Sequence, residues 1–507
     1  MGIIVSPCRV LAAASPLAAA LAFGCSAAPV DNPVRHTRAT ALFERHCAAC
    51  HGATGAADSS LVGFLRPRPR SFALGSFNLV STRNGVPTDD DLVRTLERGL
   101  PGSTMPSFAW LPDDDVRLLA QHVRELAVTG YAAARERSEH AAGRSIDRLH
   151  LRRAAERALR AGDEIPVPEP QPITDDVVAH GRSLFVERCA ACHGRDGKGF
   201  GEEPGWVHRT EFAWARDLTA GVLKGGASHR DLCWRIAAGM PAVGMPPTRL
   251  DETDTLALAA FVQSLLPADA QDKQVQRRQE IVARRVAALP TDPNDARWQL
   301  VDVTLAALQA HAGAVPRAQV AALHDGKECA FLLRWPDAAR DDVPTGVFPD
   351  GAALQLSGDQ DPPAFAMGTR TQQVHIWHWQ AYPPTALAGD LDALAPRPDG
   401  SRADVPLQPR PAEFDMPQQQ AVSAHGSGVG DLRPFRDAAA ELSAQPTWRD
   451  GSWTLILRRP LRGRSHDDID LVPGTRLHLA LAIWNGAARD AGARKSISVW
   501  QRLTLAP

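Results

Sequence analysis

The chain has 507 residues, 44% of them hydrophobic, and a formal net charge of −2 at pH 7. This length is enough for about three domains of ordinary size, and the apolar content is typical of a globular protein. The near-zero net charge argues against nucleic acid as the main partner, because binding to a phosphate backbone needs a strongly basic surface.

The first 25 residues indicate a signal peptide for export. Arg9 precedes an alanine-rich apolar stretch, residues 10–23, which is too short and too interrupted to span a membrane. The stretch ends in Gly24-Cys25, a pair that resembles the lipobox of bacterial lipoproteins, and the alternative is ordinary secretory cleavage just after it. We expect a periplasmic protein with Cys25 as a candidate lipid anchor.

The hexapeptide CAACHG occurs twice, at residues 47–52 and 189–194. Two cysteines separated by two residues and followed by histidine are the pattern for covalent attachment of a c-type haem. The thiols bond to the two vinyl groups of the haem, and the histidine ligates the iron. The pattern predicts haem attachment at Cys47, Cys50, Cys189 and Cys192, with His51 and His193 as iron ligands.

The likeness between the two copies extends on both sides of this motif. Small and aromatic residues lie eight and four positions before the first cysteine, where they share one face of a helix. They are Ala39 and Phe43 in the first copy, and Gly181 and Phe185 in the second. Each copy ends in an amphipathic helical pattern, around residues 116–123 and 258–265.

Two methionines lie at matching positions between the motif and the closing helix. Met105 and Met245 each precede a proline, within segments 99–106 and 239–246 that have identical internal spacing. Met240 has Leu100 as its counterpart, so it is expected to pack rather than to ligate. We predict Met105 and Met245 as the second axial ligands of the two irons.

Residues 37–130 and 173–268 resemble class I cytochrome c domains in the order of these features. The resemblance implies an all-α fold in which the closing helix crosses the first helix. Histidine and thioether together complete a six-coordinate iron and raise its potential relative to ligation by two nitrogens. A saturated iron has no open position for oxygen or peroxide, which favours electron transfer over substrate activation.

Two segments, 131–172 and 269–295, are expected to be linkers. The first is charged and alanine-rich, which predicts a solvent-facing helix followed by a proline-rich spacer at 165–170. The second is rich in arginine and is expected to form a helix that leads into the third domain. The arginine run at 66–70 could neutralise haem propionates or form a docking patch, and the alternative is an ordinary solvated loop.

Residues 296–507 have the character of a β domain and contain eight of the twelve tryptophans. Apolar and polar residues alternate in segments that predict strands, at 452–458, 477–484 and 497–505. Asn485-Gly486 predicts a turn between the last two. Short strands separated by Gly, Pro and Asp predict a β-sandwich or barrel.

The third domain resembles the haem b-binding γ subunit of ethylbenzene dehydrogenase and its relatives in dimethyl sulfide dehydrogenase and in selenate and chlorate reductases. The resemblance rests on several short segments, among them 323–326, 365–368, 374–379, 450–453 and 495–498. It implies a β-sandwich that holds one non-covalent haem b between a methionine and a lysine. These ligands carry over onto Met367 and Lys495.

The residues support this pair independently of the resemblance. The chain has only five lysines against a large excess of arginine, and lysine alone can lose its proton to offer a lone pair. Core packing for Met367 and an ordinary strand lysine for Lys495 remain the alternatives. His375 and His378 are competing ligands, but strand alternation places them on opposite faces.

The sequence therefore predicts a periplasmic electron-transfer cytochrome with two haem c groups and one haem b. The resemblance implies a redox partner, either a molybdenum enzyme of the DMSO reductase family or a periplasmic cytochrome. The alternatives are a haem enzyme, such as a multihaem peroxidase or small-molecule oxidoreductase, and a β-sandwich module without haem. Cys233 and Cys329 lie in different domains and are expected to be buried.

Overall fold

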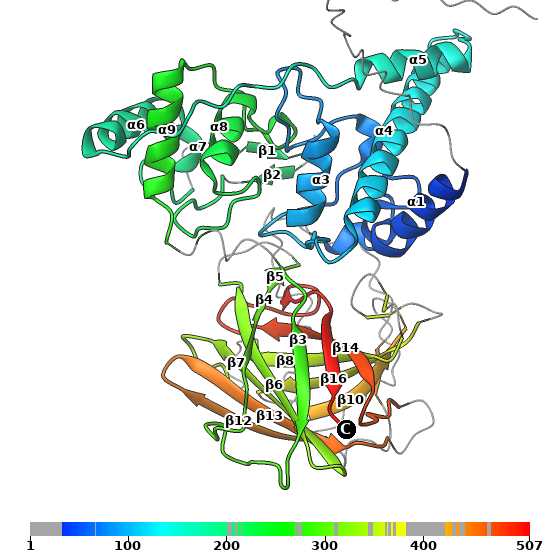
Figure 1. The fold of residues 1–507 in the computed structure, drawn as a ribbon, viewed down its shortest axis with the longest axis vertical. Helices are drawn as coiled ribbons and strands as arrows, with labels where there is room; N and C mark the ends of the chain where they lie inside the picture. The colour runs from blue at the N-terminus through cyan, green and yellow to red at the C-terminus, as the bar shows by residue number, and fades with distance from the viewer. Residues whose placement is uncertain are drawn as a thin grey trace, which may run out of the picture.

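A computed structural model of the chain describes residues 33–65, 67–199, 205–207, 211–213, 215–268, 270, 276–308, 313–342, 348–359, 362–363, 367–368, 372–381, 421–427, 432–434, 442–463 and 468–507. The expected signal peptide and Cys25 lie outside these residues. Within them, none of the helices combines the length and the apolar character that crossing a membrane requires. Two helical domains lie beside each other over one β domain (Figure 1).

The first helical domain is built around the crossing of its first and last long helices. Its elements are α1 (Pro33–His46), α2 (Ala48–His51), η1 (Val62–Phe64), η2 (Phe72–Leu74), α3 (Asp89–Arg98), α4 (Asp113–Ala141) and α5 (Arg148–Ala158). Ala39 and Phe43 are buried on α1, and Val116, Leu119 and Val123 are buried on α4, as their spacing predicts. The Thr88 side chain and the Asp91 carboxylate form a capping box that fixes the start of α3.

The second helical domain repeats this plan with α6 (Asp175–Arg188), α7 (Ala190–His193), α8 (His229–Ala238), η3 (Pro241–Val243) and α9 (Glu252–Ser264). A Cβ atom on Gly181 would lie 1.9 Å from the carbonyl oxygen of Ala257, so only glycine allows α6 to cross α9 this closely. Phe185 and Phe261 pack with ring centroids 5.1 Å apart at the same crossing. A two-stranded hairpin, β1 (Gly205–Val207) with β2 (Glu211–Ala213), is added to the helices.

The first expected linker is largely part of the first domain. The closing helix α4 continues to Ala141, and α5 folds back on it. Ala155 and Leu159 are buried against Ala127 and Val128 of α4, so this segment has an apolar face that the solvent-facing prediction missed. The proline-rich part then leads to the second domain, where the Ile165 carbonyl accepts a hydrogen bond from the Trp234 indole.

In the part of the β domain that the structure describes, one sheet of fourteen strands folds around a common core. The strands are β3 (Glu280–Arg285), β4 (Val301–Thr304), β5 (Ala306–Ala307), β6 (Arg317–His324), β7 (Glu328–Pro336), β8 (Gly351–Ser357), β9 (Val374–Gln380), β10 (Ala421–Gly426), β11 (Leu432–Pro434), β12 (Ser443–Arg449), β13 (Ser452–Pro460), β14 (Arg476–Trp484), β15 (Ser496–Ile497) and β16 (Gln501–Leu505). The main path runs β11-β10-β9-β8-β14-β16-β3-β6-β7-β13-β12. The two halves pack face to face as in a sandwich, and the parallel pairs of β3 with β16 and β6 join them.

The helix expected within 269–295 is wrong, because residues 280–285 form strand β3. Ile281 and Ala283 are buried and the residues between them are exposed, which is the two-residue period of a strand with one face in the core. The charged residues suggested a solvated helix, but they lie at the ends and outer face of this strand. The strand predicted at 497–505 is split into β15 and β16. The two predicted all-α domains and the β domain that follows them are otherwise confirmed.

Candidate haem sites

The first CAACHG segment forms the short helix α2 directly after α1. Nδ1 of His51 lies 3.0 Å from the carbonyl oxygen of Arg70, and the His51 ring stacks on Phe72 with centroids 4.6 Å apart. Burial lowers the pKa of His51, which favours the neutral imidazole. A neutral ring that donates from Nδ1 keeps the Nε2 lone pair for a metal. The residues therefore fit an iron ligand at His51.

The second segment forms α7 in the same way. Burial lowers the pKa of His193, and the Arg216 backbone, which faces this ring, raises it by a smaller amount. Nδ1 of His193 nevertheless makes no hydrogen bond of normal geometry. Burial also raises the pKa of the thiols of Cys50 and Cys189 to about 11. A cysteine joined to haem by a thioether bond would have no thiol proton to lose.

The two methionine segments have the same backbone structure. The Leu100 amide donates to the Met105 carbonyl at 3.0 Å, and the Met240 amide donates to the Met245 carbonyl at 2.8 Å. Before each segment, a glycine at positive φ lies so close to the methionine carbonyl that a Cβ atom would clash with it. Met240 thus occupies the place of Leu100, as the repeat predicts. Met105 and Met245 stay the predicted second ligands.

The β domain contains a small cavity, partly open to solvent, that brings Met367 and Lys495 together. The other lining residues are Ala353, Gln355, Ile376, Ala480, Leu481, Ala482, Trp484 and Ile497. Both predicted ligands therefore face one apolar space, although they come from distant parts of the chain. This arrangement fits a non-covalent haem, which needs an apolar cleft and two axial donors.

Lys495 is held in an environment that disfavours its charged form. Burial lowers its pKa to about 8, and its ammonium lies 4.6 Å from the centre of the Trp484 ring. The Lys495 carbonyl accepts a hydrogen bond from the Leu308 amide at 2.9 Å, which fixes the backbone just before β15. A lysine that loses its proton this readily is suited to donate a lone pair to iron.

Met367 has an unusual backbone conformation, with φ at 85°. Such a conformation costs a residue other than glycine on the order of 1–3 kcal/mol and is often found at functional sites. The next residue, Gly368, approaches the Gly426 carbonyl so closely that a Cβ atom would lie 2.5 Å from it. The sharp turn at this glycine holds Met367 at the cavity.

The two histidines of β9 lie on opposite faces, as strand alternation predicts. His378 packs edge-on against Trp484 with centroids 5.1 Å apart, and burial lowers its pKa to about 4. His375 is directed elsewhere, with Nδ1 3.6 Å from the Asp468 carboxylate. Of these two histidines, His378 is the one that contacts a residue of the cavity wall, Trp484.

A small apolar cluster joins the cavity to the first cytochrome domain. Leu65 of the first domain is buried against Leu308 and Ile497 of the β domain. Cys50 and Ala482 pack against the same cluster from the two sides. Ile497 and Ala482 also line the cavity. Nothing in the sequence pattern indicated this contact, because the residues involved are ordinary aliphatic ones.

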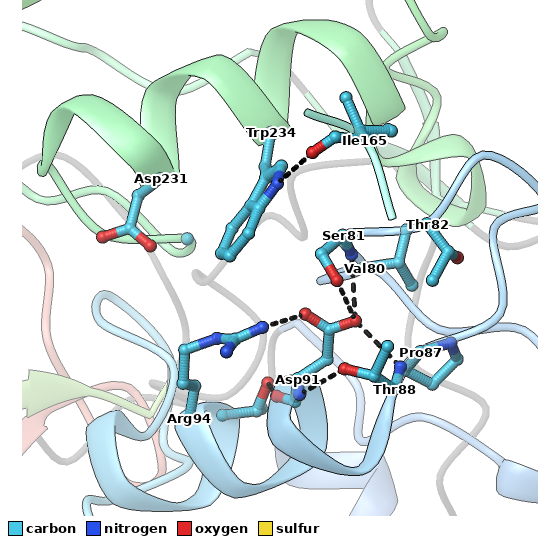
Figure 2. A network of polar contacts seen from close by, with 12 residues as sticks. Val80, Ser81, Thr82, Pro87, Thr88, Asp91, Arg94, Ile165, Asp231 and Trp234 are labelled. Atoms are coloured by element: carbon cyan, nitrogen blue, oxygen red, sulfur yellow. Dashed lines mark hydrogen bonds and ion pairs between the residues drawn. The ribbon is translucent and has the colours of Figure 1, made fainter. Parts of the chain in front are cut away.

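The two cytochrome domains meet through α3 and α8 (Figure 2). Asp91 accepts hydrogen bonds from the amide and hydroxyl of Ser81, both at 2.9 Å, and pairs with Arg94 at 2.5 Å. The Arg94 guanidinium lies over the Trp234 ring of the second domain, 4.7 Å from its centre. Arg98 pairs across the boundary with Asp231 at 2.9 Å. The sequence analysis did not identify this interface.

Three family descriptions match the three domains. Residues 35–123 match the family "Cytochrome C oxidase, cbb3-type, subunit III". Residues 178–266 match "Cytochrome c", and residues 291–496 match "Ethylbenzene dehydrogenase". The matches confirm the expected order of domains.

The chain is also similar to individual proteins. It is 21% identical over 229 residues to a candidate respiratory nitrate reductase haem subunit of Haloferax mediterranei. This alignment covers 43% of this chain and 69% of that protein. It is 25% identical over 169 residues to the γ subunit of dimethylsulfide dehydrogenase of Rhodovulum sulfidophilum, which covers 33% of this chain and 52% of that protein.

A solved structure, the reducing HAO-like protein complex of Kuenenia stuttgartiensis, aligns with 45% of this chain and 96% of its own, at 25% identity and a TM-score of 0.37.

Proposed function

Since two cytochrome c domains and an ethylbenzene dehydrogenase γ-like domain are joined in one chain, we propose that the protein is an electron-transfer haem subunit that relays electrons between a haem b site and two haem c sites. The first cytochrome domain is the middle site of this relay. Bound haem supplies reversible one-electron chemistry. The protein residues hold it, exclude water and set the distance between sites.

The observation that carries this proposal is the apolar cluster of Leu65, Leu308 and Ile497. Ile497 contributes to the wall of the haem b cavity, and Cys50, a haem attachment residue, packs on the other side of the cluster. The wall of the haem b cavity and a haem attachment residue of the first domain therefore belong to one aliphatic cluster. Close packing of this kind keeps water out and keeps the separation short.

The residues at each site favour relay over substrate turnover. His51 and His193 with Met105 and Met245 would saturate both c-type irons, and Met367 with Lys495 would saturate the b-type iron. An iron with both axial positions filled by protein does not bind a substrate directly. The alternative of a haem peroxidase would require one of these ligands to leave.

The partner in this proposal is a molybdenum oxidoreductase. The supporting observation is that the similar proteins are described as haem or γ subunits of a nitrate reductase and of dimethylsulfide dehydrogenase. The location proposed is the periplasm, with Cys25 as a lipid anchor, because covalent haem attachment takes place outside the cytoplasm. Whether the partner oxidises or reduces its own substrate would set the direction of electron flow.

The relay order can be tested with two double variants of the full chain, Cys47→Ala/Cys50→Ala and Cys189→Ala/Cys192→Ala. Each should lose one covalent haem. After flash photoreduction by a flavin semiquinone, the absorption bands of the b and c haems report how the electron is redistributed.

We expect rapid exchange between b and c haems to persist when the second motif is changed and to disappear when the first is changed. Exchange at the original rate without the first c haem would contradict the order. Carbon monoxide binding to the reduced, unaltered protein would instead support the peroxidase alternative.

A further inference from the structure

Three basic side chains gather where the two cytochrome domains meet: Arg70, Arg216 and Lys224. Two of them cross the boundary in opposite directions. Arg70 of the first domain donates to the Ala242 carbonyl of the second at 3.3 Å. Arg216 of the second donates to the Pro101 and Gly102 carbonyls of the first, at 3.0 and 3.2 Å. Each arginine therefore ends in the methionine segment of the other domain.

The backbone of each arginine lies at the iron-ligating histidine of its own domain. The Arg70 carbonyl is the acceptor 3.0 Å from Nδ1 of His51, and the Arg216 backbone faces His193. Arg70 and Arg216 each connect the histidine of their own domain to the methionine segment of the other domain. The two arginines are placed where the open edges of both sites come together.

Lys224 completes the group. Burial, followed by the charges of Arg216 and Arg70, lowers the pKa of Lys224 to about 7. Burial lowers the pKa of Arg216 to about 10 as well. Three cations therefore lie close enough to repel one another in a poorly solvated place.

The carboxylates at this boundary do not neutralise these three cations. Asp91 pairs with Arg94, and Asp231 pairs with Arg98. Among the described residues, no ion pair joins Arg70, Arg216 or Lys224 to an acidic side chain. Arg70, Arg216 and Lys224 are each half-buried, and partly desolvated cations that lack a counter-charge favour the binding of an anion.

We propose that Arg70, Arg216 and Lys224 form one carboxylate-binding site shared by the propionates of both c haems. The proposal rests on haem binding at both CAACHG motifs. Arginine forks suit carboxylates, and the site lies between the histidine side of one domain and the methionine side of the other. The reduction potentials of both haems then depend on the same three cations.

The experiment is a redox titration of the full chain carrying Lys224→Gln, with each c haem followed by its absorption. A nearby cation disfavours the oxidised, more positive haem, so its removal should lower both potentials. We expect about a tenfold decrease in each reduction equilibrium constant, which is about 59 mV for one electron. Lys224→Arg, which keeps the charge, should restore both values.

The matched control is Lys198→Gln, which removes the same charge from an exposed site of the same domain. It should leave both potentials unchanged. A shift confined to the haem of the second domain, or no shift, would overturn a shared site. Pyridine haemochrome analysis that still finds two c haems in each variant separates this outcome from failure of the proposed function.

Free phosphate is the other source of negative charge. If it occupied the site, the potentials of the unaltered protein would change as phosphate replaces chloride at constant ionic strength, and Lys224→Gln would abolish that dependence. This result would overturn binding of propionates. Potentials that do not respond to phosphate but fall in Lys224→Gln would support it.

Discussion

The cytochrome pair and the β domain provide haem sites in opposite ways. In each cytochrome domain, the two cysteines and the histidine lie within five consecutive residues, which form one short helix and the residue that precedes it. In the β domain, Met367 precedes β9 and Lys495 precedes β15, and they meet only at the cavity between them. A covalent site can thus be encoded locally, whereas a non-covalent one depends on the correct packing of the whole sheet.

The two regions also place backbone strain differently. In the cytochrome domains, the conformations at positive φ next to the methionine segments are assigned to Gly99 and Gly239, which adopt them without penalty. In the β domain, the predicted ligand Met367 itself has positive φ. The β domain therefore needs the surrounding contacts, such as that of Gly368 with Gly426, to hold its ligand.

Extraction with acidified organic solvent should give the largest difference between the haem of the β domain and the haems of the cytochrome domains. We expect all haem b to enter the solvent, because coordination bonds break when their donors are protonated, and both c haems to stay with the protein through their thioether bonds. Pyridine haemochrome spectra of the two fractions measure this. Haem c in the solvent fraction, or b-type haem retained by the protein, would contradict the contrast.

Lys495→Ala should affect only the β domain. The cavity would keep its apolar walls but lose one axial donor. The unaltered protein should contain one haem b for every two haem c, and the variant should contain much less haem b. Lys327→Ala is the control, since Lys327 is an exposed lysine of the same domain. A normal ratio with an unchanged b spectrum in Lys495→Ala would show that this lysine is not a ligand, and His378 would become the next candidate.

Met105→His tests how the axial ligand sets the potential of the first c haem. A second nitrogen ligand would keep the iron six-coordinate but lower its potential, by on the order of 0.1 V within the range of about 0.8 V that axial ligands span. A redox titration of each c haem should show the lowered potential, and electron exchange between the β domain and the second cytochrome domain should slow. Met240→His is the matched control, because Met240 has a packing role and its change should leave both c potentials nearly as they are.

Asp337→Asn addresses the stability of the β domain alone. Burial, followed by the nearby Asp350, raises the pKa of Asp337 to about 8. The folded state then keeps a proton that the unfolded state releases, so stability falls as pH rises from about 4 to about 8. We expect a decrease of about 1 kcal/mol per pH unit in the middle of this range.

The asparagine variant should lose this pH dependence, as followed by tryptophan fluorescence during thermal unfolding at several pH values. Asp302→Asn, at an exposed position, is the control and should keep it. An unchanged slope in Asp337→Asn would show that this carboxyl is already ionised in the folded state.

Much of the architecture could be predicted from the sequence because the signals were local or repeated. The helix faces of Phe43 and Phe185, the equivalence of Met240 with Leu100, and strands β13 and β14 follow from periodicity and spacing. The helix expected around β3 failed because a strand with one charged, solvent-facing side shows the same composition as a solvated helix. Only two of its residues, Ile281 and Ala283, are buried.

The two covalent motifs, the repeat around them and the change to a β domain can all be recognised in the sequence, since each depends on residues close together in the chain. The tertiary structure decided which distant residues meet. It alone placed Lys495 with Met367, Leu65 against Ile497, and Arg70 near Arg216 and Lys224. The physical reason is that burial, packing and charge repulsion depend on spatial neighbours, which spacing along a single chain does not specify.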